Sequence, residues 1–121
     1  MSYIDGFVAA VPAGNREAYR QHAIAMAAVL QEHGALRVVD AWGDDVPEGK
    51  LTSFPLSVQR EPGEVVVFGW IEWPSRAVRD AGWEKAMQDP RMNSAQMPFD
   101  GKRMIYRLSG HDVAQLGVPA E

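Results

Sequence analysis

The sequence contains no cysteine. Disulfide bonds and thiolate metal ligands are therefore excluded, and the redox state of the protein's compartment cannot be read from thiols. A chain of 121 residues still buries about two-thirds of its unfolded surface on folding, so it needs neither a disulfide nor a structural metal. The sequence also lacks an internal repeat, a low-complexity tract or a linker. We therefore expect a single domain over residues 1–121.

Basic residues and long apolar runs are scarce. The sequence has 12 Lys and Arg against 16 Asp and Glu, a formal net charge of −4. Because proteins bind phosphate backbones through cations, we expect no nucleic-acid partner.

No segment approaches the roughly 18 apolar residues of a membrane span, so we expect no membrane association. The N-terminal segment contains an acidic residue, Asp5, and Pro12 interrupts its apolar run. A secretory signal would instead have a cationic start and an unbroken apolar stretch. The default expectation is a cytoplasmic location.

Apolar periodicity predicts six secondary-structure elements. Asn15 and Ser75 are placed to cap the starts of two helices, and Gly34 is placed to end the first of them. Asp100 and Gly101 give a turn signal before the last strand. The predicted elements are a strand over 3–11, a helix over 15–33, strands over 36–43 and 65–71, a helix over 75–88 and a strand over 103–108, followed by a loosely held tail over 109–121.

The order of these elements, β-α-β-β-α-β, predicts an α+β fold of the ferredoxin-like type over about residues 3–108. Such a fold has an antiparallel four-stranded sheet with both helices on one face. A strand with one solvated face should alternate apolar and polar residues. The strand over 65–71 is instead apolar on both faces, with Val67 and Ile71 on one and Val66 and Phe68 on the other. We therefore expect a second copy of the chain to cover the open face, in a homodimer that packs sheet to sheet. The alternative is that the connection over 44–63 or the tail covers it.

Five segments, spread over residues 3–106, carry a resemblance. They are residues 3–8, 33–37, 64–68, 89–92 and, above all, the run Met97-Pro98-Phe99-Asp100-Gly101-Lys102-Arg103-Met104-Ile105-Tyr106. Together they resemble the YbaA-like family of bacterial proteins, a domain-of-unknown-function family. The resemblance implies the dimeric α/β-barrel superfamily, in which two ferredoxin-like sheets face each other, and it implies no activity. It also implies two glycines and a phenylalanine after Tyr106, where this sequence has Arg107, Leu108 and Ser109.

His22 and Asp40 are the candidate catalytic residues. His22 lies beside the apolar stripe of the first predicted helix, and an imidazole titrates near neutrality. The alternative for His22 is a boundary residue with a local hydrogen bond. Asp40 lies within a predicted strand, where a buried carboxylate serves either as a general base or as half of a structural ion pair. Arg76 or Arg79 on the second helix would be its partner in such a pair.

Trp42, Arg79 and Trp83 are the candidate ligand-binding residues. Trp42 shares a strand face with Asp40, whereas Arg79 and Trp83 lie on the second predicted helix. For the tryptophans, packing in the core or in a dimer interface is the alternative. The sequence has no phosphate-binding glycine loop. His22 and His33 lie about 16 Å apart along their helix, too far to share a metal ion. We therefore expect no cofactor and no metal.

Two functions from different classes stay open at this point. The first is a pocket between sheet and helices for an aromatic or apolar small molecule, in a protein that either only binds it or acts as a cofactor-independent enzyme. The second is a non-catalytic dimeric interaction module. A solidly packed subunit with an exposed apolar patch near Phe54 or Phe99 would favour the second.

Overall fold

The computed structural model describes residues 2–94 and 97–114. Its elements follow the order strand, helix, strand, strand, helix, strand, with short helices added between them. They are β1 (Tyr3–Pro12), the 3-10 turn η1 (Ala13–Asn15), α1 (Arg16–Glu32), β2 (Arg37–Trp42), α2 (Phe54–Ser57), β3 (Glu64–Trp73), α3 (Arg76–Met87), α4 (Pro90–Ser94), the 3-10 turn η2 (Gly101–Arg103) and β4 (Ile105–His111).

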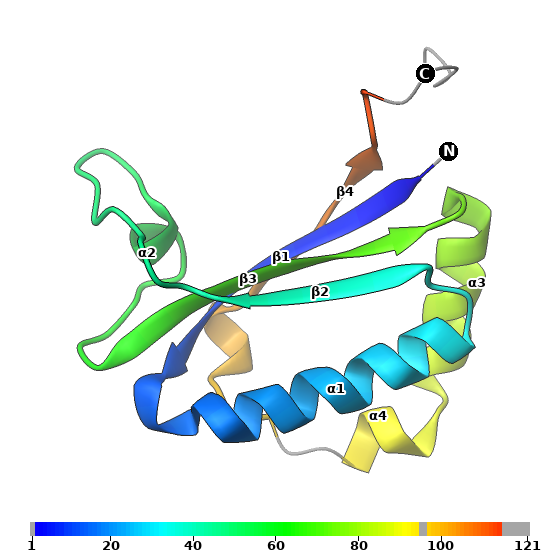
Figure 1. Cartoon of the computed structure of the whole chain (residues 1–121), viewed down its shortest axis with the longest axis horizontal. Helices are drawn as coiled ribbons and strands as arrows, with labels where there is room; N and C mark the ends of the chain where they lie inside the picture. The colour runs from blue at the N-terminus through cyan, green and yellow to red at the C-terminus, as the bar shows by residue number, and fades with distance from the viewer. Residues whose placement is uncertain (1, 95–96, 115–121) are drawn as a thin grey trace.

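The four strands form one antiparallel sheet in the order β2-β3-β1-β4. The helices α1, α3 and α4 lie on one side of this open, twisted sheet, and α2 sits on an arm that extends from the β2 and β3 end (Figure 1). The fold is therefore of the α+β class, with a helix layer against one sheet face. No helix in the described part of the chain has the length and apolarity needed to cross a membrane.

Two of the three residues predicted to cap or end the helices do so in the structure. The Ser75 hydroxyl accepts a hydrogen bond from the Val78 amide at 3.2 Å, so the predicted cap of α3 is confirmed. Gly34 follows α1 with φ of +115°, a backbone region that favours glycine. Asn15 precedes α1 but makes no capping bond, because its Nδ2 donates instead to the Pro98 carbonyl at 2.8 Å. The predicted Asn15 cap is therefore wrong, and this side chain holds the segment before η2 against the start of α1.

The final strand starts and ends later than the sequence predicts. Residues 101–103 form η2 rather than the start of a strand, and Arg103 there forms a salt bridge with Glu64 at 2.7 Å. Strand β4 continues to His111, which pairs with Tyr3. The prediction of a loose tail from residue 109 is therefore wrong for residues 109–111, because ladder hydrogen bonds hold them to β1. Residues 115–121 of that predicted tail lie outside the described residues. The sequence also gave no prediction of α2 or α4.

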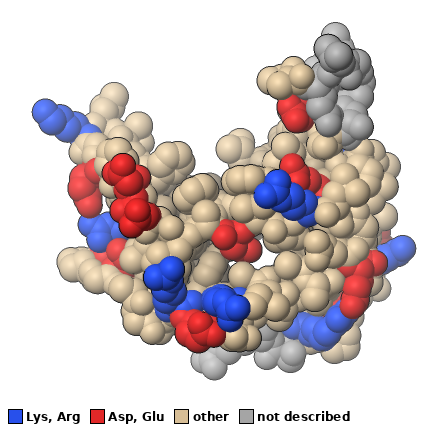
Figure 2. Space-filling view, viewed as in Figure 1, with Lys and Arg blue, Asp and Glu red and all other residues tan. Residues whose placement is uncertain are grey.

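The two sheet faces are covered differently. On the helix side, Val11, Val29, Val67 and Trp73 are almost completely buried. On the other side, the connection between β2 and β3 folds back so that the fully buried Val58 packs against residues of β1 and β3. In the space-filling view, the hollow between the α2 arm and the end of β4 is lined largely by uncharged residues (Figure 2). The connection therefore covers one end of the second face and leaves the rest open.

Candidate functional site

A pocket with a volume of about 390 Å³ lies between the helix-facing side of the sheet and the helices. Apolar side chains form most of its wall, and five of the six methionines of the sequence are among them. The residues that line it are Asp5, Gly6, Phe7, Tyr19, His22, Ala23, Met26, Leu30, Val38, Asp40, Ile71, Trp83, Met87, Met92, Met97, Phe99, Met104, Tyr106 and Arg107. Such a wall suits an apolar or aromatic ligand, and unbranched methionines adapt to its shape.

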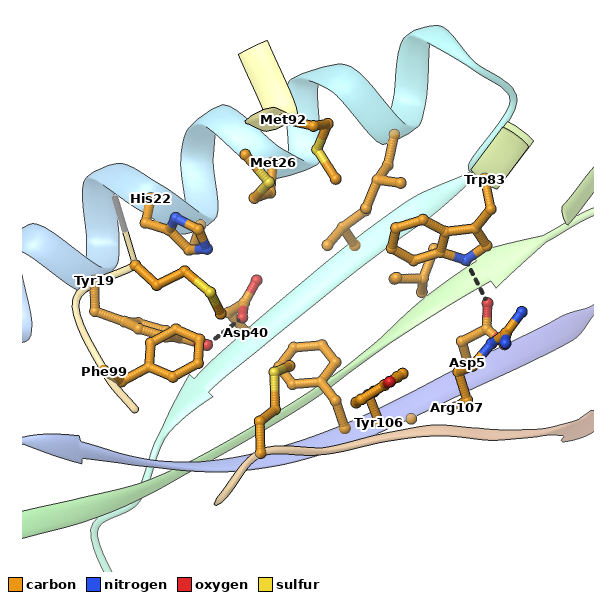
Figure 3. Close-up of a pocket in the computed structure, with 18 of the residues that line it drawn as sticks. Asp5, Tyr19, His22, Met26, Asp40, Trp83, Met92, Phe99, Tyr106 and Arg107 are labelled. Carbon is orange, nitrogen blue, oxygen red and sulfur yellow. Dashed lines mark hydrogen bonds between the residues drawn. The ribbon is translucent and has the colours of Figure 1, made fainter. Parts of the chain in front are cut away.

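One end of the pocket carries three polar side chains, Tyr19, His22 and Asp40, here named the Asp40 group. Tyr19 and His22 are three residues apart on α1 and therefore share a helix face. Asp40 reaches them from β2, and the Tyr19 hydroxyl donates a hydrogen bond to Asp40 Oδ1 at 2.7 Å (Figure 3). The ring of Phe99 lies against both aromatic members, with centroids 5.8 Å from Tyr19 and 6.0 Å from His22. The polar group is thus enclosed by apolar surface.

A glycine shapes the floor beside Asp40. Gly69 of β3 pairs with Asp40 on one side and with Phe7 on the other. A Cβ at Gly69 would lie 2.0 Å from the Val39 carbonyl oxygen and 2.5 Å from the Phe7 ring. Only glycine therefore allows the Phe7 ring to lie across β3 at this point, where it forms part of the pocket wall.

Burial sets the protonation of the Asp40 group. Burial raises the pKa of Asp40, an effect that the Tyr19 hydrogen bond and the charge of His22 only partly oppose. Burial and the neighbouring Asp40 charge also raise the pKa of Tyr19, so its hydroxyl stays protonated as a donor. Burial lowers the pKa of His22 despite the opposing charge of Asp40, which favours a neutral imidazole. The His22 Nδ1 atom is buried and has no hydrogen-bond partner among the described residues.

The other end of the pocket is fixed by a second carboxylate, Asp5. Its oxygens accept hydrogen bonds from Trp73 Nε1 at 3.0 Å, Trp83 Nε1 at 3.1 Å, Arg79 Nε at 3.1 Å and the Ser109 hydroxyl. Burial acts to raise the pKa of Asp5, but the hydrogen bonds from Ser109, Trp83 and Arg79 and the Arg79 charge outweigh burial, and the pKa is lowered. Asp5 is therefore ionised and fully partnered, so it serves as a structural anchor rather than a free base.

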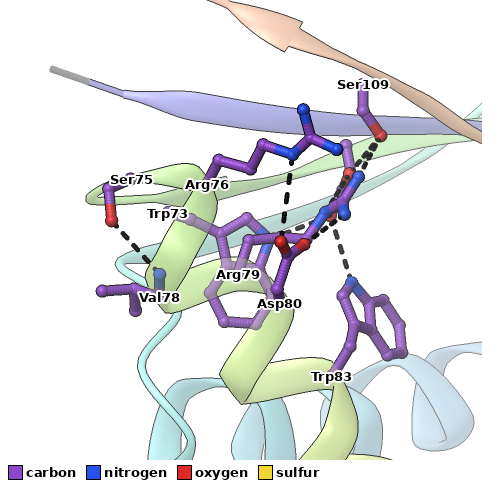
Figure 4. Close-up of polar contacts among 9 residues, drawn as sticks. Trp73, Ser75, Arg76, Val78, Arg79, Asp80, Trp83 and Ser109 are labelled. Atoms are coloured by element: carbon purple, nitrogen blue, oxygen red, sulfur yellow. Dashed lines mark hydrogen bonds and ion pairs between the residues drawn. The ribbon is translucent and has the colours of Figure 1, made fainter.

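The predicted ion pair between Asp40 and an arginine of the second helix is wrong. The Arg79 guanidinium binds Asp5, Asp80 and Ser109 (Figure 4). Arg76, the other predicted partner, lies 3.8 Å from Asp80. The reason is topological, because α3 starts beside the end of the sheet that carries Asp5, whereas Asp40 lies on the edge strand β2, where Tyr19 of α1 contacts it.

The structure brings together only some of the candidate site residues. Asp40, His22 and Trp83 line the pocket. Trp42 lies outside it, where its ring packs 6.2 Å from Tyr19 and stacks under the Arg16 guanidinium. Arg79 also lies outside the pocket, and its hydrogen bond to Asp5 holds that carboxylate in the pocket wall. Among the described residues, no cluster of His, Asp and Glu is arranged to hold a metal ion.

Sequence reasoning did not identify Asp5, Tyr19 or Arg107 as site residues. Asp5 had a readable signal, because it is an acid on the same strand face as Phe7 and Ala9 within an apolar strand. Tyr19 falls within the apolar stripe of the first predicted helix, a pattern that predicts a core position rather than a site residue. Arg107 had no local signal as a pocket residue, since its position depends on how β4 pairs with β1.

The chain is similar to known proteins, and none of those named below has a named activity. Residues 2–101 match the family described as "Protein of unknown function (DUF1428)". The chain is 56% identical over 108 residues to the "Uncharacterized protein YbaA" of Escherichia coli strain K12, an alignment that covers 88% of this chain and 92% of that protein. The same values hold for the proteins of that name from Escherichia coli O157:H7 and Shigella flexneri. These names state no activity, so the site itself must supply the functional argument.

Proposed function

Because this chain belongs to the DUF1428 family of proteins of unknown function, together with YbaA, we propose a function from its pocket. The protein binds a mainly apolar or aromatic small molecule between the sheet and the helices, with the Asp40 group as the polar anchor. One observation carries the proposal, namely that an apolar cavity of about 390 Å³ has a partly buried carboxylate and an unpartnered imidazole nitrogen in the same end wall. Convergent polar groups in an apolar cavity are typical of ligand sites.

The Asp40 group supports proton transfer as well as binding. The hydrogen bond from Tyr19 occupies Oδ1 of Asp40, and the other carboxylate oxygen has no hydrogen bond from the described residues. Its raised pKa makes Asp40 a stronger base than an exposed aspartate. A ligand O–H or acidic C–H held beside this oxygen can give up its proton to it without a metal or an organic cofactor. In this proposal Asp40 is the base, and Tyr19 orients it.

The proposal extends to the quaternary structure. The strand order β2-β3-β1-β4 supports a ferredoxin-like fold, and the sheet face opposite the helices carries Phe68, Ile105 and Leu108 in exposed positions. A second copy of the chain would cover this face and form a dimeric α/β barrel. The same open face favours the second candidate function, a dimeric interaction module. Of the residues expected to mark such a module, Phe54 is exposed on α2, whereas Phe99 packs against the Asp40 group.

Thermal melting against a panel of aromatic acids, quinones, heme and flavins tests the pocket. A ligand at about 100 times its Kd stabilises the folded state by about 2.7 kcal/mol, a readily measured rise in Tm. We expect at least one probe to raise the Tm of the wild-type protein. The Asp40→Asn variant, which keeps the side-chain shape and removes the basic carboxylate, should lose most of that rise.

Two variants serve as controls for this experiment. Asp44→Asn makes the same chemical change at an exposed residue outside the pocket, so it should respond to the probe as the wild type does. Ala23→Phe places a ring in the cavity from α1 and should abolish the response while leaving the Asp40 group in place. If no probe raises the Tm, or if Ala23→Phe responds as the wild type does, the pocket proposal is wrong.

A further inference from the structure

The polar groups of the pocket are unevenly distributed between its two ends. The Asp40 group, at one end, presents a carboxylate oxygen that accepts hydrogen bonds, beside the unpartnered Nδ1 of His22. Arg107 lines the other end, near Asp5 and Trp83 (Figure 3). It supplies the only cationic side chain among the residues that line this pocket. A ligand that matched both ends would therefore carry a hydrogen-bond donor at one end and a negative charge at the other.

A β-bulge brings Arg107 to the pocket. Gly6 pairs with Leu108 and Val8 pairs with Ile105, so the single residue Phe7 faces two residues of β4, Tyr106 and Arg107. Arg107 adopts φ of +67°, a left-handed conformation that is unfavourable for a residue with a side chain. In a regular strand, two consecutive side chains point to opposite faces of the sheet. A bulge of this kind redirects one of them, so that both can point to the same face. As a result, both Tyr106 and Arg107 line the cavity.

Arg107 has no ion-pair partner in the described part of the chain. The Asp5 carboxylate, at the same end of the pocket, is already bound by Arg79, Ser109 and two tryptophans. Asp80, which also binds Arg79, pairs with Arg76 as well. The acidic charges at this end are thus compensated by other arginines, and the Arg107 guanidinium is left free to bind an anion.

From this arrangement we infer that the ligand is an organic carboxylate, with its anionic group on Arg107, an aromatic or aliphatic body along the methionine-rich wall and a donor group toward Asp40. This inference rests on the proposed function, because it concerns the ligand of the same pocket. A guanidinium binds a carboxylate in a two-pronged arrangement. Polyanions such as nucleotides fit poorly, because the pocket lining contains this one cation and two acids.

Matched acid and amide probes test the inference. Benzoate, para-hydroxybenzoate, indole acetate and octanoate each have a primary amide of nearly the same shape without the charge. Titration calorimetry of the full chain should give Kd values roughly tenfold or more lower for the best acid than for its amide, as a charged hydrogen-bonded pair predicts. In Arg107→Gln the acid should bind no better than its amide, and the amide should bind as in the wild type.

Two further variants separate charge at this site from charge elsewhere. Arg37→Gln removes an exposed arginine of β2 that makes no ion pair with the described residues, and it should keep the wild-type preference for the acid. Arg107→Lys retains a cation and should keep part of the preference for the acid. Equal Kd values for acid and amide in the wild type, or an unchanged preference in Arg107→Gln, would overturn the carboxylate inference and leave the pocket proposal standing. Failure of every acid and every amide to bind would also overturn the carboxylate inference, whereas the pocket proposal would be decided by the melting panel with quinones, heme and flavins.

Discussion

Two aspartates in one pocket have opposite protonation behaviour because their partners differ. Asp5 accepts hydrogen bonds from two indoles, a guanidinium and a hydroxyl. Burial acts to raise its pKa, but the bonds from Ser109, Trp83 and Arg79 and the Arg79 charge lower it. Burial raises the pKa of Asp40, and the hydrogen bond from Tyr19 and the charge of His22 oppose it only in part. Residue type alone therefore does not assign a role. The number of donors around each carboxylate makes Asp5 structural and leaves Asp40 available for chemistry.

The residue-scale prediction concerns Asp5. Replacing Asp5 with Asn should lower the free energy of unfolding at pH 7 by about 3 kcal/mol, because it leaves the buried Arg79 guanidinium without its counter-charge. The pKa of Asp5 is lowered in the folded state, so its stabilisation is fully present above the ordinary value of 3.8 and is lost as the pH falls through the folded pKa. Urea denaturation at pH 7 and pH 3 should therefore show a smaller difference between wild type and variant at pH 3.

Asp80→Asn is the matched control for this prediction. Asp80 also pairs with Arg79, but its side chain is 54% exposed, so its loss should cost less than about 1 kcal/mol. Equal costs for the two substitutions would contradict the assignment of Asp5 as the anchor of the network.

At the scale of elements, the position of α3 depends on a close contact with the sheet. Gly82 of α3 is buried against Trp73 of β3 and against the end of α1. A Cβ there would lie 2.5 Å from the Trp73 ring and 2.7 Å from the His33 carbonyl oxygen. The glycine therefore lets α3 come close enough to the sheet for Arg79 and Trp83 to reach Asp5. Helix propensity alone would favour alanine at this position.

Gly82→Ala should consequently destabilise the fold by roughly 1–3 kcal/mol, despite the better helix propensity of alanine, because α3 must move away from Trp73. Denaturant titration followed by tryptophan fluorescence measures the change. Gly14→Ala provides the control, since a Cβ at Gly14 has no atom within 4 Å, and it should be close to neutral. A Gly82→Ala protein as stable as wild type would show that α3 is not held by this contact.

At the scale of the whole molecule, one face of the sheet is only partly covered. Val58 of the connection between β2 and β3 covers the end of the face near Ala10 and Val66. Elsewhere Phe68 and Ile105 are each 41% exposed and Leu108 is 80% exposed. These side chains lie on β3 and β4, the two strands that flank β1. Exposed apolar side chains on one sheet face are typical of an interaction surface, and a second copy of the same sheet is complementary to it.

We therefore predict a homodimer at micromolar concentration that Leu108→Glu converts to a monomer, because a charge would be buried in the sheet-to-sheet interface. Light scattering gives the mass, and circular dichroism should show an unchanged fold. Ile24→Glu changes a half-exposed aliphatic residue on α1, in the helix layer away from this face, and should leave the dimer intact. A monomeric wild-type protein would refute the sheet-to-sheet dimer.

The sequence by itself was sufficient for the local parts of this protein. The main strands and helices, the Ser75 cap and the Gly34 helix end all depend on residues close together in the chain. The family resemblance rests on the order of such local segments along the chain. His22, Asp40 and Trp83 could be selected because each combines a reactive or aromatic group with a predicted core-facing position. Periodicity is a property of neighbouring residues, which is why these inferences needed no three-dimensional information.

Only the tertiary structure decided which of these side chains meet. Asp5 and Ser109 are 104 positions apart and touch because β1 pairs with β4, and Arg79 binds Asp5 rather than Asp40 because α3 packs at that end of the sheet. The bulge that brings Arg107 to the pocket is likewise a property of strand register. Such contacts depend on long-range pairing and packing, whose energies outweigh the local preferences that a sequence pattern records.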